Sequence, residues 1–247
     1  MTALRPPSAD SVLYVVYQRD GDGAVTYEID GGSVVSFWHG QAFEHAGKYY
    51  YVGFTTRTDG REGGIADDGM MAPGQVAIGQ ATFVQAGTPE QPRWAQVETD
   101  GYVGEFGAHD QGDPVDGRRP VQMHDTGDGR VLLAIPTRRF AGGVVRCQHA
   151  MFLFDPGNTD GLGFRRWGYL GSVAGLAGDE AVPGGLGADA AGSQATPLAF
   201  GAAGAHGLPL LAYASAGAVA GEDEGRGPGP ANALTYAFDT KAGIYQP

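Results

Sequence analysis

The sequence predicts an all-β protein, and three observations support this prediction. Glycine accounts for 43 of the 247 residues, well above its usual share of about 7%, and it recurs between short apolar runs. Those runs are rich in β-branched and aromatic residues, which favour strands. No segment repeats apolar residues at helical spacing for more than about two turns. Because glycine accepts positive φ without steric cost, the pattern indicates short strands joined by tight turns.

The N-terminal part of the chain is expected to contain a flexible segment and then a hairpin. Residues 1–11 contain several polar residues together with Pro6 and Pro7, so we expect a flexible segment there and a single β domain over residues 12–247. Two strand-like runs follow, at 13–17 and 24–29, with Asp-Gly-Asp-Gly at 20–23 between them. Asp-Gly is a favoured hairpin turn, so the two runs are predicted to pair.

The rest of the chain contains three similar groups of strand-like runs. They lie at 34–38, 48–57, 76–85 and 93–97, then at 121–123, 130–138, 147–155 and 166–170, and finally at 198–200, 208–213, 234–239 and 244–245. Meandering groups of three or four strands are typical of propeller blades. We therefore predict a propeller-like domain of three multi-stranded antiparallel units. A β-sandwich or β-prism is the alternative, because each group is longer than a blade of about 40–50 residues.

The net charge of −12 limits the partners that this chain can bind. Such a charge repels nucleic acid and favours either a basic protein partner or simply solubility. No apolar run reaches the length of a membrane span, so none is expected. If Met1 is the native start, the protein is expected in the cytoplasm; if a signal peptide preceded this sequence, it is expected in the periplasm.

Motifs for metals, cofactors and catalysis are weak throughout the sequence. His39 and His45 do not have the His-Glu-x-x-His spacing of a zinc helix and are interpreted as residues at a sheet rim. Asp20, Asp22 and Glu28 offer too few oxygens for calcium and are interpreted as part of a turn. There is no P-loop, no Gly-x-Gly-x-x-Gly after a strand and no Gly-x-Ser-x-Gly. We therefore expect no metal, no cofactor and no catalytic residue.

Two further groups of residues suggest chemistry less directly. Cys147 and His149 project from the same strand face, as a nucleophile pair would, but their apolar surroundings favour a structural thiol. Five acidic residues also lie close together in sequence and are interpreted as a solvated loop: Glu98, Glu105, Asp110, Asp113 and Asp116.

These features favour a non-catalytic protein-binding domain, for example a bacterial immunity or inhibitor protein that neutralises a basic enzyme or toxin. The predicted partner-binding residues are acidic loop residues together with two aromatic residues: Asp67, Asp68, Glu222, Asp223, Glu224, Trp38 and Tyr50. Aromatic side chains are enriched at interfaces, and complementary charge speeds association. The alternative is a carbohydrate-binding or carbohydrate-hydrolysing β protein, which requires an exposed aromatic platform and facing carboxylates.

Overall fold

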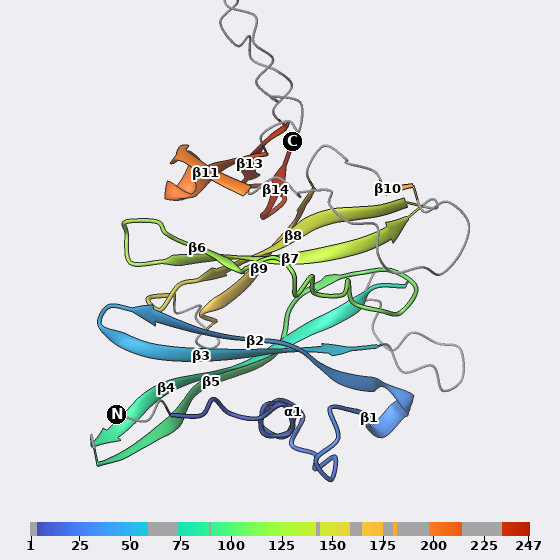
Figure 1. Ribbon diagram of the computed structural model, residues 1–247, viewed down its shortest axis with the longest axis vertical. Coiled ribbons are helices and arrows are strands. Elements are labelled where there is room, and N and C mark those ends of the chain that lie inside the picture. Colours follow the sequence, from blue (N-terminus) through green and yellow to red (C-terminus); the bar gives the residue numbers. More distant parts are fainter. Residues whose placement is uncertain are drawn as a thin grey trace, which may run out of the picture. The chain divides into compact units, whose positions relative to one another are not determined.

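The computed structural model describes residues 4–58, 74–88, 90–141, 144–158, 165–174, 180–181, 198–213 and 234–247. These residues confirm the all-β prediction, because they form antiparallel strands, one α-helix and two 3-10 turns (Figure 1). No helix in this part of the chain is long and apolar enough to cross a membrane.

The strands belong to three antiparallel sheets. The first sheet contains, in hydrogen-bonded order, β1 (Thr26–Glu28), β2 (Val34–His45), β3 (Lys48–Arg57), β4 (Val76–Thr88) and β5 (Gln91–Phe106). The second contains β6 (Gln122–Asp125), β7 (Val131–Ala141), β8 (Val144–Phe154), β9 (Trp167–Ala174) and β10 (Glu180–Ala181), and both β9 and β10 pair with β8. The third contains β11 (Leu198–Ala203), β12 (Pro209–Tyr213), β13 (Leu234–Asp239) and β14 (Ile244–Gln246). Each predicted group of strands therefore falls within one sheet.

The chain divides into two compact units. The first consists of Met1–Val115 and Asp155–Tyr169, and the second of Asp116–Phe154 and Leu170–Pro247. The first unit is thus completed by a segment that follows much of the second in sequence. Whether residues 12–247 behave as a single domain stays a prediction, which an unfolding experiment described below addresses.

The predicted N-terminal hairpin is wrong. Its first run lies in helix α1 (Ala9–Tyr17), which begins within the segment expected to be flexible, and β1 pairs with β2 instead. The helix packs on the first sheet, where glycines leave room for it. A Cβ atom at Gly53 would lie 2.5 Å from a methyl of Val12, and one at Gly79 would lie 3.2 Å from a methyl of Val16. Tertiary packing therefore overrides the strand preference of a run rich in valine and tyrosine.

Aromatic packing fills the other face of the first sheet. The Trp167 ring stands edge-on to Phe54, with centroids 5.3 Å apart, and to Phe43. Its indole N–H donates a hydrogen bond of 2.8 Å to the Thr82 hydroxyl on β4. Both Trp167 and Thr82 are buried, so residues 155–169 supply a central part of this unit's core.

The core of the second unit lies between its two sheets. Apolar side chains of β7, β8 and β9 pack against inward-facing side chains of the third sheet, and together they form one buried cluster. Its members include Leu132, Met151, Val173, Leu211 and Tyr236. Along β12 and β13 the buried residues alternate with more exposed ones, as expected for a sheet with one face on a core.

Candidate functional site

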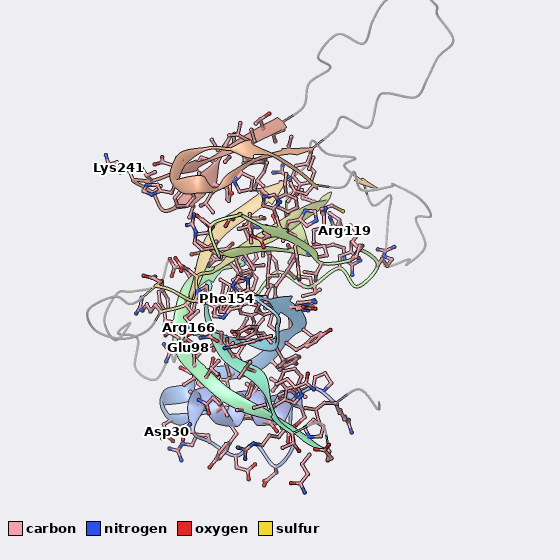
Figure 2. All side chains as sticks on the ribbon, turned by 90° about the vertical axis from the view of Figure 1, so that its left-hand side faces the viewer. Asp30, Glu98, Arg119, Phe154, Arg166 and Lys241 are labelled. Atoms are coloured by element: carbon pink, nitrogen blue, oxygen red, sulfur yellow. The ribbon has the colours of Figure 1, made fainter. Side chains whose placement is uncertain are left out.

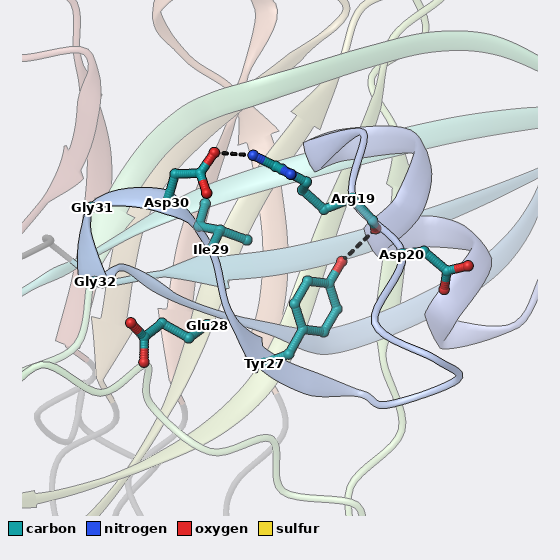
Figure 3. A pocket seen from close by; sticks show the side chains of 8 residues that line it. All are labelled: Arg19, Asp20, Tyr27, Glu28, Ile29, Asp30, Gly31 and Gly32. Carbon is teal, nitrogen blue, oxygen red and sulfur yellow. Dashed lines mark hydrogen bonds and ion pairs between the residues drawn. The ribbon is translucent and has the colours of Figure 1, made fainter.

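An open recess of about 400 Å³ lies in the first unit, where the chain turns from α1 into β1 (Figure 3). Helix α1 ends at Tyr17, and Gln18 adopts a left-handed conformation that turns the chain away. The opposite wall is the 3-10 turn η1 (Asp30–Gly32), in which Gly31 and Gly32 both have positive φ. Glycine accepts this conformation without strain, which allows the chain to reverse between β1 and β2.

Tyr27 lies at the centre of the recess. Its hydroxyl donates a hydrogen bond of 2.9 Å to the carbonyl oxygen of Arg19. Its ring lies against Gly21, where a Cβ atom would come within 2.4 Å of two ring carbons. The ring is therefore held in place from both ends, and Figure 3 shows Asp20 and Glu28 on either side of it.

The recess carries more negative than positive charge. Its lining contains three carboxylates, on Asp20, Glu28 and Asp30, and a single guanidinium, on Arg19. Arg19 forms an ion pair with Asp30, so the other two carboxylates are not neutralised by it. The pKa of Tyr27 is raised, first by partial burial and then by the negative charge of Asp20.

The geometry does not favour a metal ion in this recess. Calcium requires six or more converging oxygens, whereas among the described residues no three acidic, histidine or cysteine side chains gather closely enough to hold an ion. One oxygen of Asp20 also accepts the backbone N–H of Asp22, as in an ordinary Asx turn. The arrangement therefore suits a cationic organic group better than a bare metal.

The predicted set of partner-binding residues stays a prediction, because five of its seven members, Asp67, Asp68, Glu222, Asp223 and Glu224, lie outside the described residues. The two aromatic residues are partly buried within the first unit and contact its other rings. Trp38 packs edge-on to Phe106, with centroids 4.9 Å apart, and Tyr50 stacks on Phe43.

The three tryptophans are all anchored by their indole N–H groups. Trp38 donates to the carbonyl oxygen of Asp113, and Trp94 donates to that of Arg5. Trp167 donates to Thr82, as described above. None of the three indoles is more than partly exposed, so each serves the packing of the first unit.

The acidic residues at 98–116 differ in their burial and in their partners. Glu98 is half-buried, which raises the pKa of its carboxyl group, and one of its oxygens accepts the backbone N–H of Arg166 at 2.8 Å (Figure 2). Asp116 belongs to the second unit, where Arg119 pairs with it at 2.9 Å. Asp113 is buried in the first unit, so these residues are not one solvated loop.

The hydrogen-bond partner of His149 is Tyr213, which lies on another strand. The Nδ1 atom of His149 lies 2.5 Å from the hydroxyl of Tyr213, which also donates to the carbonyl oxygen of Val173. His149 is buried, and its pKa is lowered to about 3, first by burial and then by the positive charge of Arg119. A neutral histidine fixed in this way is a poor general base at neutral pH. Cys147 is a free thiol that is only partly buried.

Two groups of polar residues were not predicted from the sequence: the recess around Tyr27 and the hydrogen-bond network around His149. Asp20, Asp22 and Glu28 were singled out, but no sequence signal connected them with Tyr27 or with Asp30. The network around His149 joins residues as far apart as Asp116 and Tyr213, which have no common motif. The chain matches no protein-family model, no curated protein and no solved structure at a significant level.

Proposed function

We propose that this chain is a non-catalytic protein-binding domain that engages a basic partner, as an inhibitor or immunity protein does. The observation that carries the proposal is the acidic recess around Tyr27. It combines an aromatic ring held in place with two carboxylates that the neighbouring guanidinium does not neutralise.

A lysine or arginine side chain of the partner fits this chemistry. A cation over a tyrosine ring gains about 0.5–1 kcal/mol at an exposed site, and flanking carboxylates add charge-assisted hydrogen bonds. The Arg19–Asp30 ion pair orders the wall opposite the helix. The overall charge of −12 attracts the same partner from a distance and raises its association rate.

The acidic residues Asp67, Asp68, Glu222, Asp223 and Glu224 belong to the same proposal. Their charges add to the negative charge that would attract a basic protein. In this proposal the recess supplies a specific contact, and these charges supply long-range attraction that salt screens.

For the scaffold that would present this surface, we propose a propeller-like relationship among the three sheets. Each sheet contains a four-stranded antiparallel meander: β2 to β5, β6 to β9, and β11 to β14. Units of this kind bury their faces on one another and present loops for binding. A sandwich or prism of three sheets would present loops in the same way.

Carbohydrate binding or hydrolysis is the second candidate, and no specific observation favours it. It requires an exposed aromatic platform, whereas the three tryptophans are anchored in the first unit. It also requires two carboxylates about 5–9.5 Å apart in a cleft. Of the carboxylates considered, Glu98 and Asp116 each bond to an arginine of their own unit.

The test is affinity capture from the source cells followed by binding measurements on variants. The full chain should capture a basic protein in stoichiometric amount, and capture of none would refute the proposed function. Titration calorimetry with that partner should then show weaker binding for Glu28→Gln by about 2–5-fold, the effect of one exposed charge pair. Glu44→Gln removes the same charge from another exposed strand position of the first unit and should bind as the unaltered chain does. Equal affinities of the two variants for the partner would exclude the recess as the site of contact.

A further inference from the structure

The N-terminal segment before α1 lies against the first sheet in a defined way. The indole N–H of Trp94, on β5, donates a hydrogen bond of 2.9 Å to the main-chain carbonyl oxygen of Arg5. The two residues are 89 positions apart in the chain. Trp94 also packs beside Tyr51, with centroids 6.2 Å apart, on the buried cluster that contains Phe83.

The backbone of this segment favours polyproline II. Pro6 and Pro7 fix their own φ near about −65°, and a residue that precedes proline is pushed toward extended or polyproline II conformations. Ser8, directly before the helix, has φ −74° and ψ 161°, close to ideal polyproline II values of about −75° and +145°. Proline geometry and the dihedral angles of Ser8 therefore both favour polyproline II, with three residues per turn, over Leu4 to Ser8.

The burial of the segment follows the same period. Leu4 and Pro7 are partly buried, whereas Arg5, Pro6 and Ser8 are exposed. Residues three apart lie on one face of a polyproline II helix. The face carrying Leu4 and Pro7 is therefore the one turned toward the protein, with an indole N–H bonded to the carbonyl between them.

These features together match a general mode of peptide recognition. Proline-rich segments dock on aromatic side chains because their conformation is already formed and costs little entropy to fix. The bond from Trp94 goes to a main-chain carbonyl, so it does not depend on which side chain stands at that position. The contacts described for the segment include this hydrogen bond and the partial burial of Leu4 and Pro7.

We propose that the surface around Trp94, whose indole rests beside the buried Tyr51 ring and which is here called the Trp94 site, binds a proline-containing segment of a partner protein. The chain's own residues 4–8 occupy the site and regulate access to it. Because those residues are tethered to α1, they act at an effective concentration of the order of mM. A partner segment must displace them, so the Trp94 site is closed until a competing proline-rich sequence is present at high local concentration. The proposal is independent of the acidic recess, which lies at the other end of α1 and uses different residues.

The test uses the full chain and a synthetic peptide of residues 4–8, Leu-Arg-Pro-Pro-Ser, acetylated and amidated. The double variant Leu4→Asp, Pro7→Asp should release the chain's own segment, because each new carboxylate opposes burial. NMR of the tryptophan indole groups should show the Trp94 signal moving in this variant. Adding the peptide should return that signal saturably toward its position in the unaltered chain. The unaltered chain should need at least about 10-fold more peptide, because its tethered segment competes.

Two controls separate recognition from non-specific contact. A peptide with glycine at both proline positions should bind several-fold more weakly, since it must pay the entropy of becoming extended. Adding Trp94→Phe to the double variant keeps an aromatic ring but removes the N–H donor, and should weaken binding by about 3–10-fold, the loss of one hydrogen bond. Because this variant has no Trp94 signal, its affinity is measured by titration calorimetry and compared with that of the double variant measured in the same way.

Three results would overturn the proposal. The first is that the peptide, at mM concentration, does not shift the Trp94 signal of the double variant. The second is that the glycine peptide binds the double variant as tightly as the proline peptide does. The third is that adding Trp94→Phe leaves the affinity of the double variant for the peptide unchanged. Concentration-dependent dimerisation of the unaltered chain, abolished by the double variant, would assign the site to a second copy and overturn the assignment to a different partner.

Discussion

The buried histidine of the second unit should make the protein sensitive to mild acid. His149 is 2% exposed, and its pKa in the folded protein is about 3, whereas an unfolded histidine has a pKa of about 6.5. Between these values the unfolded chain binds a proton that the folded chain does not. Stability contributed by the neutral ring is therefore fully present above about pH 6.5 and is lost as the pH falls toward 3.

The size of the effect follows from the difference between the two states. Between about pH 7.5 and about pH 5 the histidine of the unfolded chain becomes protonated, which stabilises the unfolded state. The free energy of unfolding falls by about 2 kcal/mol as a result, because protonation is favourable over about 1.5 of these pH units. The result hardly depends on the folded pKa, because any value below about 4 leaves the folded ring neutral at both pH values. His39, whose pKa is also lowered by burial, adds a loss of the same sign, so a variant is needed to isolate His149.

The assay is urea unfolding at both pH values, followed by far-UV circular dichroism. The variant His149→Gln keeps an amide that can bond to the Tyr213 hydroxyl but cannot titrate. Its free energy of unfolding should fall by about 2 kcal/mol less than that of the unaltered chain over the same pH range. His109→Asn removes an exposed histidine of the first unit and is the matched control for replacing a histidine with an amide. An equal fall in the unaltered chain and in His149→Gln would refute the reasoning, whatever the absolute stability of the variant.

Three other predictions test the packing of the units. Gly53→Ala places a methyl within 2.5 Å of Val12 and should lower the free energy of unfolding by about 1–3 kcal/mol. The control Gly101→Ala has open space around it and should change that free energy by less than about 0.5 kcal/mol. Equal effects of the two substitutions would contradict the packing of α1 on β3. Trp167→Phe leaves the buried Thr82 hydroxyl without its indole donor and should cost about 1–3 kcal/mol, measured by urea unfolding; a loss below about 0.5 kcal/mol would show that the bond is unimportant. If residues 12–247 are one cooperative domain, tryptophan fluorescence, which reports only the first unit, should give the same urea midpoint as circular dichroism; separate midpoints would show two independently unfolding units.

The strands were predictable because their signals are local. The run at 48–57 is rich in aromatic and β-branched residues, and it forms β3 as expected. Helix α1 was missed because Val12, Val15 and Val16 are β-branched, which lowers helix propensity. What makes the helix favourable is the space above Gly53, about 40 residues away, and no window of sequence reveals it.

The polar groupings were unpredictable for the same reason. The carboxylates near Tyr27 resembled an ordinary turn, and they form a recess only because β1 folds back on β2. His149 and Tyr213 belong to different sheets, and their hydrogen bond exists only once those sheets pack together. Sequence periodicity predicts which face of a strand is buried, but it does not predict what lies opposite that face.

The discontinuity of the first unit has a consequence for synthesis on the ribosome. The strands of the first sheet all emerge by Phe106, yet Trp167 is made only after β6, β7 and β8. Throughout that interval the Thr82 hydroxyl has no indole donor, and the rings of Phe54 and Phe43 have no Trp167 to pack against. Nascent chains usually fold from the N-terminal end; here the first unit to be translated cannot be completed until most of the second sheet has left the ribosome.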